Sequence, residues 1–429
     1  MKCKIHTRVA SAALFGAVAL HSWSSWAGGI WLYEQGTPDQ GLATAGRAVL
    51  AKDASTAFAN PAGMTRLDCS QAMGTLGAIV IQSEFETDSR TTVGGGGADL
   101  LSALPSATGF YIHSVSPDLK LGVSMTPLAG LALDYGDTWA GRYQQRNSML
   151  LGVAISPTFA YKVNEWLSVG GGPSLGYSYL RGEAAINNVL DGLPDGTLKV
   201  RSDAIGIGGL AGILIEPDPA TRFGVQYIAP MTMKYENLVD SVSGVGPALT
   251  TLSFIVGRRL DIPRGSNADL ELTFPQTVMV SGYRDLTDRL SVVANVGWQN
   301  WSQYAKSTTT IAGRDSSRDA GYDDTWHGAL GFQYTFAPGW LGSAGFAYDS
   351  SPVSTWNRTL AFPADRQFRY GLGVQRVIDD RLTLGLAYTL LDAGKATINN
   401  AGGPLSGTLS GGYSPNFVHA ISLNAIFRF

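Results

Sequence analysis

Apolar side chains recur at every second position along most of this chain, in segments of about 10 to 16 residues that begin near residue 72 and continue to the end. This period is that of a β-strand with one apolar face and one small or polar face. The sequence is 45% hydrophobic and 15% charged, yet after the N-terminus no apolar run reaches the 18 or so residues that a membrane helix needs. The apolar residues are therefore expected on strands. In the final segment they fall at Phe417, Ile421, Leu423, Ala425, Phe427 and Phe429, interrupted only at His419.

The connections between these segments alternate strictly between short and long. The short ones are rich in turn residues and fall at 116–118, 164–165, 217–219, 285–288, 337–339 and 379–380. The long, more polar ones fall near 88–105, 129–147, 183–199, 237–270, 305–324, 351–365 and 393–415. Six turns and seven loops imply 14 strands, and this asymmetry is typical of bacterial outer-membrane barrels. We predict an all-β fold, a 14-stranded antiparallel transmembrane β-barrel; a soluble sandwich would have short loops at both ends.

The first 27 residues have the organisation of an export signal. A positive region with Lys2, Lys4 and Arg8 precedes an apolar stretch at 9–20 and a small-x-small cleavage motif at 25–27. The alternative, an N-terminal anchor helix, is disfavoured because the apolar stretch is too short to span a bilayer. Export and the barrel pattern together predict location in the outer membrane of a Gram-negative bacterium. Cleavage would leave Cys69 as the only cysteine, without an intramolecular disulfide.

Residues 28–70 lack the strand pattern, so the barrel is expected to span 71–429. The segment is rich in Ala, Gly and short polar residues but also carries apolar residues such as Trp31, Leu42 and Phe58. A disordered periplasmic tail is the alternative, but such tails are poor in apolar residues. We therefore predict a compact N-terminal hatch, a plug inside the barrel lumen.

Several motifs occur in an order that resembles one known family. The most specific is Asn60-Pro61-Ala62-Gly63-Met64, and further similar stretches lie at 139–143, 157–161, 298–302, 348–352 and 363–366. These motifs resemble the FadL-type outer-membrane transporters, with the first similar to that family's hatch. The resemblance implies a barrel with hatch residues Asn60, Pro61, Ala62 and Gly63, and uptake of hydrophobic compounds. It favours long-chain fatty acids as cargo, with monoaromatic hydrocarbons as the alternative and a porin for polar solutes as a weaker one.

The resemblance further implies that the ligand binds in an apolar pocket and leaves sideways through the barrel wall, at the third strand. That strand would begin at Leu119, and its candidate breakers are Gly122, Pro127 and Gly130. Proline lacks a ladder donor, so Pro127 marks either a bulge inside the strand or merely the end of the strand.

A ligand groove is predicted in the 237–270 loop, where Leu249, Leu252, Phe254 and Ile255 form an apolar cluster in a region expected to be exposed. Exposed clusters of this kind usually mark binding surfaces; the alternative is packing beneath neighbouring loops. A cationic side chain would stabilise a bound carboxylate, and the candidates are Arg142, Arg258 and Arg259. Arginines in such loops more often pair with loop carboxylates or lipopolysaccharide phosphates.

Signals for catalysis are weak. The stretch around Ser174 matches G-x-S-x-G literally, but that motif requires a strand-to-helix turn and here falls inside a strand. The histidines lack metal-ligand spacing, and a net charge of -3 gives no basic surface for nucleic acid. We therefore predict a protein that is not an enzyme and has no metal or cofactor. Its expected partners are a hydrophobic ligand, outer-membrane lipid and lipopolysaccharide, and the barrel-assembly machinery through the terminal Phe429; a monomer is expected.

Overall fold

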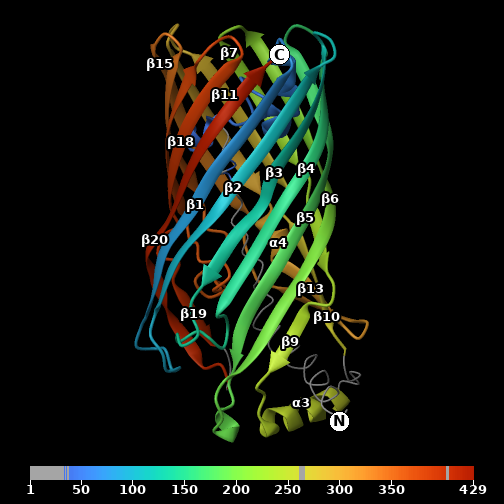
Figure 1. Cartoon of the computed structure of the whole chain (residues 1–429), viewed down its shortest axis with the longest axis vertical. Coiled ribbons are helices and arrows are strands. Elements are labelled where there is room, and N and C mark those ends of the chain that lie inside the picture. Colours follow the sequence, from blue (N-terminus) through green and yellow to red (C-terminus); the bar gives the residue numbers. More distant parts are fainter. Residues whose placement is uncertain (1–32, 34, 36–37, 260–265, 402–404) are drawn as a thin grey trace.

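The computed structural model describes residues 33, 35, 38–259, 266–401 and 405–429, and the predicted signal peptide lies outside them. Within these residues, 14 antiparallel strands form one closed barrel in which the first strand pairs with the last (Figure 1). The predicted fold class is confirmed. The wall strands are β1 (Gln71–Thr87), β2 (Ala98–Ser114), β3 (Leu119–Asp134), β4 (Asn147–Lys162), β5 (Leu167–Ile186), β6 (Gly196–Asp218), β7 (Thr221–Ile228), β11 (Thr277–Asp285), β12 (Leu290–Gln299), β15 (Thr325–Ala337), β16 (Trp340–Asp349), β17 (Gln367–Val377), β18 (Leu382–Asp392) and β20 (Thr408–Arg428).

The two ends of the barrel differ as the connection lengths predict. Short turns and the C-terminus lie at the upper end in Figure 1, and the long connections lie at the lower end. Along the wall, large apolar side chains face outward at alternate positions, as at Leu76, Leu101 and Ile207, which are 71 to 74% exposed. Such a band suits contact with lipid. The terminal Phe429 is exposed, and its backbone N–H donates to the carbonyl of Ser70 at 3.0 Å.

Shorter elements fill the N-terminal segment and the long connections. None of the helices in the described part of the chain is long and apolar enough to span a membrane. The shorter elements are η1 (Pro38–Leu42), α2 (Thr56–Ala59), η2 (Pro61–Arg66), η3 (Val189–Asp191), β8 (Met231–Tyr235), β9 (Val239–Ser243), α3 (Pro247–Arg259), β10 (Ala268–Phe274), α4 (Trp301–Tyr304), β13 (Lys306–Ile311), β14 (Arg314–Asp319) and β19 (Ile398–Ala401).

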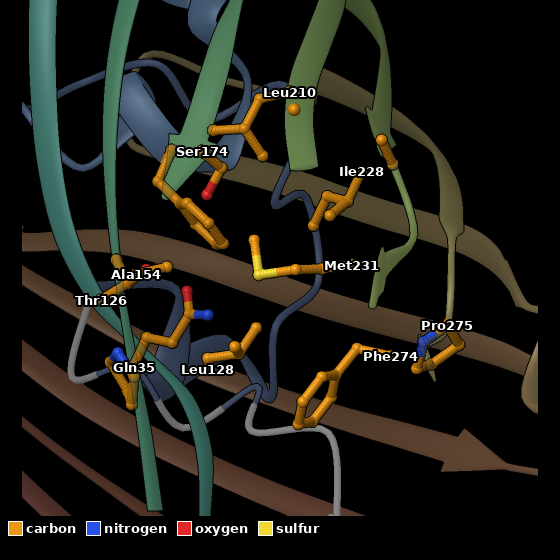
Figure 2. A pocket seen from close by; sticks show the side chains of 14 residues that line it. Gln35, Thr126, Leu128, Ala154, Ser174, Leu210, Ile228, Met231, Phe274 and Pro275 are labelled. Carbon is orange, nitrogen blue, oxygen red and sulfur yellow. The ribbon is translucent and has the colours of Figure 1, made fainter. Parts of the chain in front are cut away.

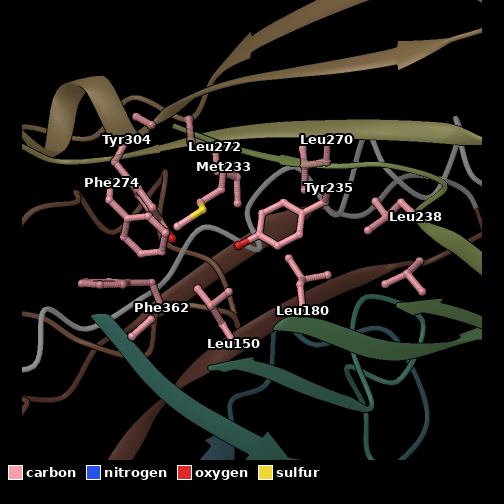
Figure 3. Close-up of a cluster of buried hydrophobic side chains, with 14 of the residues drawn as sticks. Leu150, Leu180, Met233, Tyr235, Leu238, Leu270, Leu272, Phe274, Tyr304 and Phe362 are labelled. Carbon is pink, nitrogen blue, oxygen red and sulfur yellow. The ribbon is translucent and has the colours of Figure 1, made fainter. Parts of the chain in front are cut away.

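Two long connections build a second sheet, which the sequence analysis treated as loops. Its strand order is β14-β13-β10-β8. Strands β8 and β10 form because their residues alternate, with Met231, Met233 and Tyr235 buried on one face of β8. These side chains pack with Leu180 of the wall and Phe274 of β10 in a large apolar cluster (Figure 3). We call the whole apolar cluster that these residues and Leu249 belong to the outer cluster. It lies toward the end of the barrel that carries the long connections.

The N-terminal segment, residues 38–67, folds inside the barrel. Its helix η1 packs on β16, β17 and β18, whereas η2 packs on β4, β5 and β6 across the lumen. Wall glycines permit this close approach. A Cβ atom added at Gly345 would lie 1.9 Å from the carbonyl oxygen of Leu42, and one at Gly224 would lie 2.1 Å from that of Ala48. Any side chain at these positions would push the segment away from the wall.

Replacing Gly345 by valine should therefore displace the N-terminal segment without opening the barrel. We expect trypsin to cleave after Arg47, which is now buried and paired with Asp39, at least about tenfold faster than in the unchanged protein, because displacement exposes that backbone. Gly328→Val is the matched control, since an added Cβ at Gly328 meets nothing within 4 Å. Equal cleavage rates in the two variants would contradict the packing described here.

Candidate functional site

The ladder between β2 and β3 is incomplete. Pairing stops after Gly109 meets Met125, although the ladders on either side, β1–β2 and β3–β4, continue almost to the outer ends of the strands. Farther out, β2 and β3 meet again through a hydrogen bond from Ser102 Oγ to the carbonyl oxygen of Ala132 at 3.0 Å. Between these two contacts lies a gap in the wall, which we call the wall opening.

A β-bulge in β3 borders the wall opening. Pro127 pairs with Val153 and Ala129 pairs with the adjacent Gly152, so Leu128 is an extra residue without a partner in β4. Proline has no N–H to donate, which favours a break in the ladder at this point. The structure thus decides between the two interpretations of Pro127: it lies in a bulge within β3 and not at the end of the strand.

The extra residue reverses which positions face the lumen. Before the bulge, the buried positions in β3 are even-numbered, as at Ser124 and Thr126. After it they are odd-numbered, as at Leu131 and Leu133. Strand β2 keeps one phase throughout, with even-numbered residues inward. Strand β4 also keeps one phase, and it pairs with β3 past the bulge through a register shift of one residue. No such shifted ladder forms between β2 and β3, where regular pairing ends before the bulge.

The wall opening contains an apolar cavity of about 460 Å³. It is lined by residues of β1 to β5, among them Leu104, Pro127, Gly130, Val153 and Tyr177, and by no charged side chain among the described residues. Of the three predicted strand breakers, Pro127 and Gly130 therefore border the opening. The third, Gly122, lies in regular pairing, where an added Cβ would lie 2.6 Å from Met64 Sδ; it makes room for the N-terminal segment.

A second cavity lies in the lumen, which we call the inner cavity (Figure 2). Its volume is about 20 Å³, room for about one water molecule. Pro127 lines both cavities, so the bulge separates the inner cavity from the wall opening. Met231 and Phe274 belong both to its lining and to the outer cluster. The lining also includes Gln35, Phe58, Thr126, Leu128, Ala154 and Ser174.

Asn60 connects the N-terminal segment to itself and to the wall. Its side-chain amide donates to the carbonyl oxygens of Ala48 at 2.7 Å and of Ile213 in β6 at 3.0 Å. Its Oδ1 accepts from the backbone N–H of Ala62 at 3.2 Å, capping η2. Pro61 follows at the first helical position, where its missing N–H costs no hydrogen bond. The predicted hatch residues thus form one hydrogen-bonded turn against the wall.

A buried polar cluster that the sequence analysis did not predict surrounds Tyr33, which precedes the N-terminal segment. The Tyr33 ring stacks on His327 with centroids 4.8 Å apart, and the Arg369 guanidinium lies 5.0 Å from the centre of the same ring. His327 Nδ1 lies 2.9 Å from Asp349 Oδ1, and Arg369 also pairs with Asp349. Gln299 donates to the Tyr33 hydroxyl at 2.9 Å. Lumen-facing charges in an otherwise alternating strand are the sequence signal that could have found this cluster.

The predicted ligand groove falls on helix α3 at the outer end of the barrel. Leu249 is buried in the outer cluster, but Leu252, Phe254 and Ile255 are 42 to 48% exposed. The helix begins where it does because its first turn is capped from another loop: Asp191 of η3 accepts from the N–H of Ala248. The structure thus places three of the four groove residues on an exposed surface and the fourth beneath it.

The candidate carboxylate partner Arg142 is already engaged. Its Nε donates to Asp195 Oδ2 at 2.9 Å, and its guanidinium also bonds the carbonyl oxygen of Gly94 and the Tyr143 hydroxyl. Partial burial opposes the charge on Arg142, but the hydrogen bond and charge of Asp195 outweigh it and raise the pKa of Arg142 above its ordinary value. Arg142 thus connects its own loop to the loops that contain Gly94 and Asp195. The side chains of Arg258 and Arg259 lie outside the described residues.

The remaining candidate for chemistry is Ser174, which lies within β5. Its Oγ accepts a hydrogen bond from Ser156 Oγ at 2.8 Å, and no histidine bonds it within the described part of the chain. There is also no group of three or more His, Cys, Asp or Glu residues that could hold a metal in that part. The site is therefore a pair of apolar cavities in and beside a barrel wall.

These features define a class: outer-membrane barrels that enclose their own N-terminal segment and have an interrupted wall. A family model described as outer membrane protein transport protein (OMPP1/FadL/TodX) matches residues 18–429, and the chain belongs to this family. The protein is thus an outer-membrane transporter of hydrophobic compounds in a Gram-negative bacterium.

Curated relatives and solved structures agree with this assignment. The chain is 26% identical to a long-chain fatty acid transport protein of Escherichia coli O6:H1 over 418 residues, 89% of this chain and 91% of the relative. It is 23% identical to outer membrane protein P1 of Haemophilus influenzae over 410 residues, 85% and 86% of the two chains. The fold is similar to that of a Pseudomonas aeruginosa FadL homologue, with TM-score 0.82, 22% identity and coverage of 94% and 100%. It is also similar to that of the P. putida toluene transporter TodX, with TM-score 0.64, 14% identity and coverage of 90% and 98%.

Asn60→Ala should loosen the N-terminal segment, because it removes three hydrogen bonds at a buried position, each worth about 1 kcal/mol. If the segment blocks the lumen, we expect the ion conductance of the purified barrel in planar bilayers to rise severalfold. Asn357→Ala, at an exposed loop residue with one bond to Gly321, is the control and should leave conductance unchanged. Unchanged conductance after both Asn60→Ala and deletion of residues 38–66 would exclude a hatch role.

Proposed function

We propose that the protein takes up hydrophobic compounds by a sideways route: capture at α3, passage through the outer cluster to the inner cavity, and release through the wall opening into the bilayer. Each stage has an apolar surface, and neighbouring stages share residues of that surface. The outer cluster shares Met231 and Phe274 with the inner cavity, and the inner cavity shares Pro127 with the wall opening. An apolar cargo would therefore not cross water inside the barrel, where each exposed CH₂ group costs about 0.8 kcal/mol.

The observation that carries the proposal is the interrupted β2–β3 ladder. Strand edges are not left open toward hydrocarbon, because unpaired backbone groups there cost several kcal/mol each. A barrel that is paired on both sides of the interruption has no evident structural need for it. Passage of cargo through the wall would account for the interruption.

The predicted hatch supports the same route. Residues 38–67 cross the lumen and are bonded to opposite walls through Gln40 and Asn60. In the proposed mechanism this segment blocks a straight path to the periplasm. A porin for polar solutes, the weaker alternative, would need an unblocked lumen.

For the cargo, we propose long-chain fatty acids, in line with the relatives from E. coli and Salmonella typhi, which are long-chain fatty acid transport proteins. Monoaromatic hydrocarbons are the alternative, and the similar structures include a toluene transporter. Apolar linings separate such ligands weakly, by about 1 to 3 kcal/mol for a methylene-sized difference. Uptake assays with both classes would decide between them.

Deletion of Leu128 is the sharpest test of lateral release. It removes the extra residue and restores a single alternation along β3, so the strand can pair regularly with β2 and close the opening. We expect the initial uptake rate of radiolabelled hexadecanoate to fall at least about tenfold in cells without another such transporter.

Leu128→Ala is the matched control, because it shortens the side chain but keeps the extra residue; its uptake should stay near that of the unchanged protein. Both variants are first checked for the heat-dependent gel mobility of a folded barrel. Full uptake through a folded deletion variant would place the exit elsewhere.

Charges on the exposed face of α3 should weaken capture. For Leu252→Asp with Ile255→Asp we expect the half-saturating hexadecanoate concentration to rise about tenfold with little change in the maximal rate, because the initial apolar contact is lost. Thr251→Asp, on the same helix and also exposed, should have a much smaller effect. Identical concentration dependence in all three proteins would argue against α3 as the capture surface.

A further inference from the structure

We propose that the inner cavity binds the polar end of the cargo in an uncharged form, as an alcohol, a carbonyl group or a protonated carboxylic acid on an apolar chain. The inference rests on the proposed function and deepens it, since it specifies the charge state in which cargo occupies the cavity. It follows from the hydrogen-bonding groups that face the cavity and from the absence of charge among its described lining residues.

Three neutral polar side chains line the inner cavity (Figure 2). Thr126 is 1% exposed, and its Oγ1 has no hydrogen-bond partner. Ser174 Oγ accepts from Ser156, so its own proton is available for donation. Gln35 Oε1 accepts from Arg47 Nη2 at 2.9 Å, which leaves the amide N–H groups of Gln35 for the cavity. A buried hydroxyl without a partner costs free energy, and an oxygen atom of a ligand would remove that cost.

Charge is absent from this lining. Arg47 reaches the cavity only through Gln35, and its Nε lies 3.0 Å from Asp39 Oδ2, with both side chains at most 5% exposed. The positive charge is therefore already compensated. An ionised carboxylate in the cavity would lose its hydration without gaining a counter-charge, which favours its neutral form. Hydroxyl and amide groups can satisfy a neutral oxygen without that penalty.

The rest of the lining suits the apolar part of such a molecule. Leu128, Met231 and Phe274 line the cavity beside the polar groups (Figure 2). The cavity of about 20 Å³ must widen to admit an alkyl chain, and the unbranched side chain of Met231 can change rotamer at small cost. Movement of Leu128, which is only partly buried, would join the inner cavity to the wall opening beyond Pro127.

The test compares three unbranched ligands of eight carbon atoms in the full-length mature protein in lipid nanodiscs: 1-octanol, octanoate and n-octane at pH 8, where the carboxyl group is ionised. Each competes against radiolabelled 1-octanol, and empty nanodiscs correct for partition into lipid. We expect 1-octanol to bind at least tenfold more tightly than octanoate and several-fold more tightly than n-octane.

Thr126→Val keeps the shape of the side chain and removes the hydroxyl. It should weaken 1-octanol binding about fivefold and leave n-octane binding unchanged. Thr108→Val is the matched control, because Thr108 is also a buried, lumen-facing strand residue with an unpartnered hydroxyl but does not line the cavity. It should not change the affinity for 1-octanol.

Two results would overturn the inference and leave the proposed uptake standing: octanoate binding as tightly as 1-octanol at pH 8, or Thr126→Val binding 1-octanol as the unchanged protein does. Failure of all three ligands to bind, together with no hexadecanoate uptake by cells, would instead refute the proposed function and the inference with it.

Discussion

Backbone groups of a barrel wall must find partners within the protein, because hydrocarbon offers none. That constraint explains closure of β1 onto β20 and the long, regular ladders around most of the wall. The same constraint makes the interruption between β2 and β3 significant. At the wall opening, a single extra residue, Leu128, puts the outer half of β3 out of phase with β2. The change of one residue in register coincides with an opening toward β2, although the ladder with β4 continues across it.

The same wall also has to hold a segment of its own chain. Most lumen-facing positions in such a barrel could carry side chains, but the N-terminal segment packs directly on wall backbone at Gly345 and Gly224. At Gly212, an added Cβ would lie 1.9 Å from Asn60 Oδ1, so the anchoring asparagine also depends on a glycine. The 53 glycines of the sequence are therefore partly explained by close contact between segment and wall. Polar bonds such as those of Asn60 then fix which wall strands the segment meets.

Much of the fold could be predicted because strands and turns leave local signals. The period-two pattern and the turn residues gave the 14 wall strands and their short connections. The same pattern occurs in β8 and β10, yet sequence alone does not tell whether such a strand joins the wall or the second sheet. The candidate site was harder to predict from the sequence than the fold. Pro127 could be singled out, but its two interpretations differed only in the pairing of β3 with its neighbours. Arg142 looked like a ligand cation, and only the folded loops show it bonded to Asp195.

Gln35, Thr126 and Ser174 could not have been grouped from the sequence, because Gln35 precedes η1, whereas Thr126 lies in β3 and Ser174 in β5, and the three meet only across the lumen. Their placement beside the bulge puts these three polar side chains next to the wall opening. Thr126 is the last inward residue before the phase of β3 reverses, and Pro127 next to it borders the wall opening. A molecule whose oxygen bonds Thr126 is therefore held one residue from the gap. If the wall opening leads into hydrocarbon, an uncharged polar end enters the bilayer at lower free-energy cost than a charged one. The neutral form that the inner cavity is proposed to favour is therefore also the form that the bilayer favours.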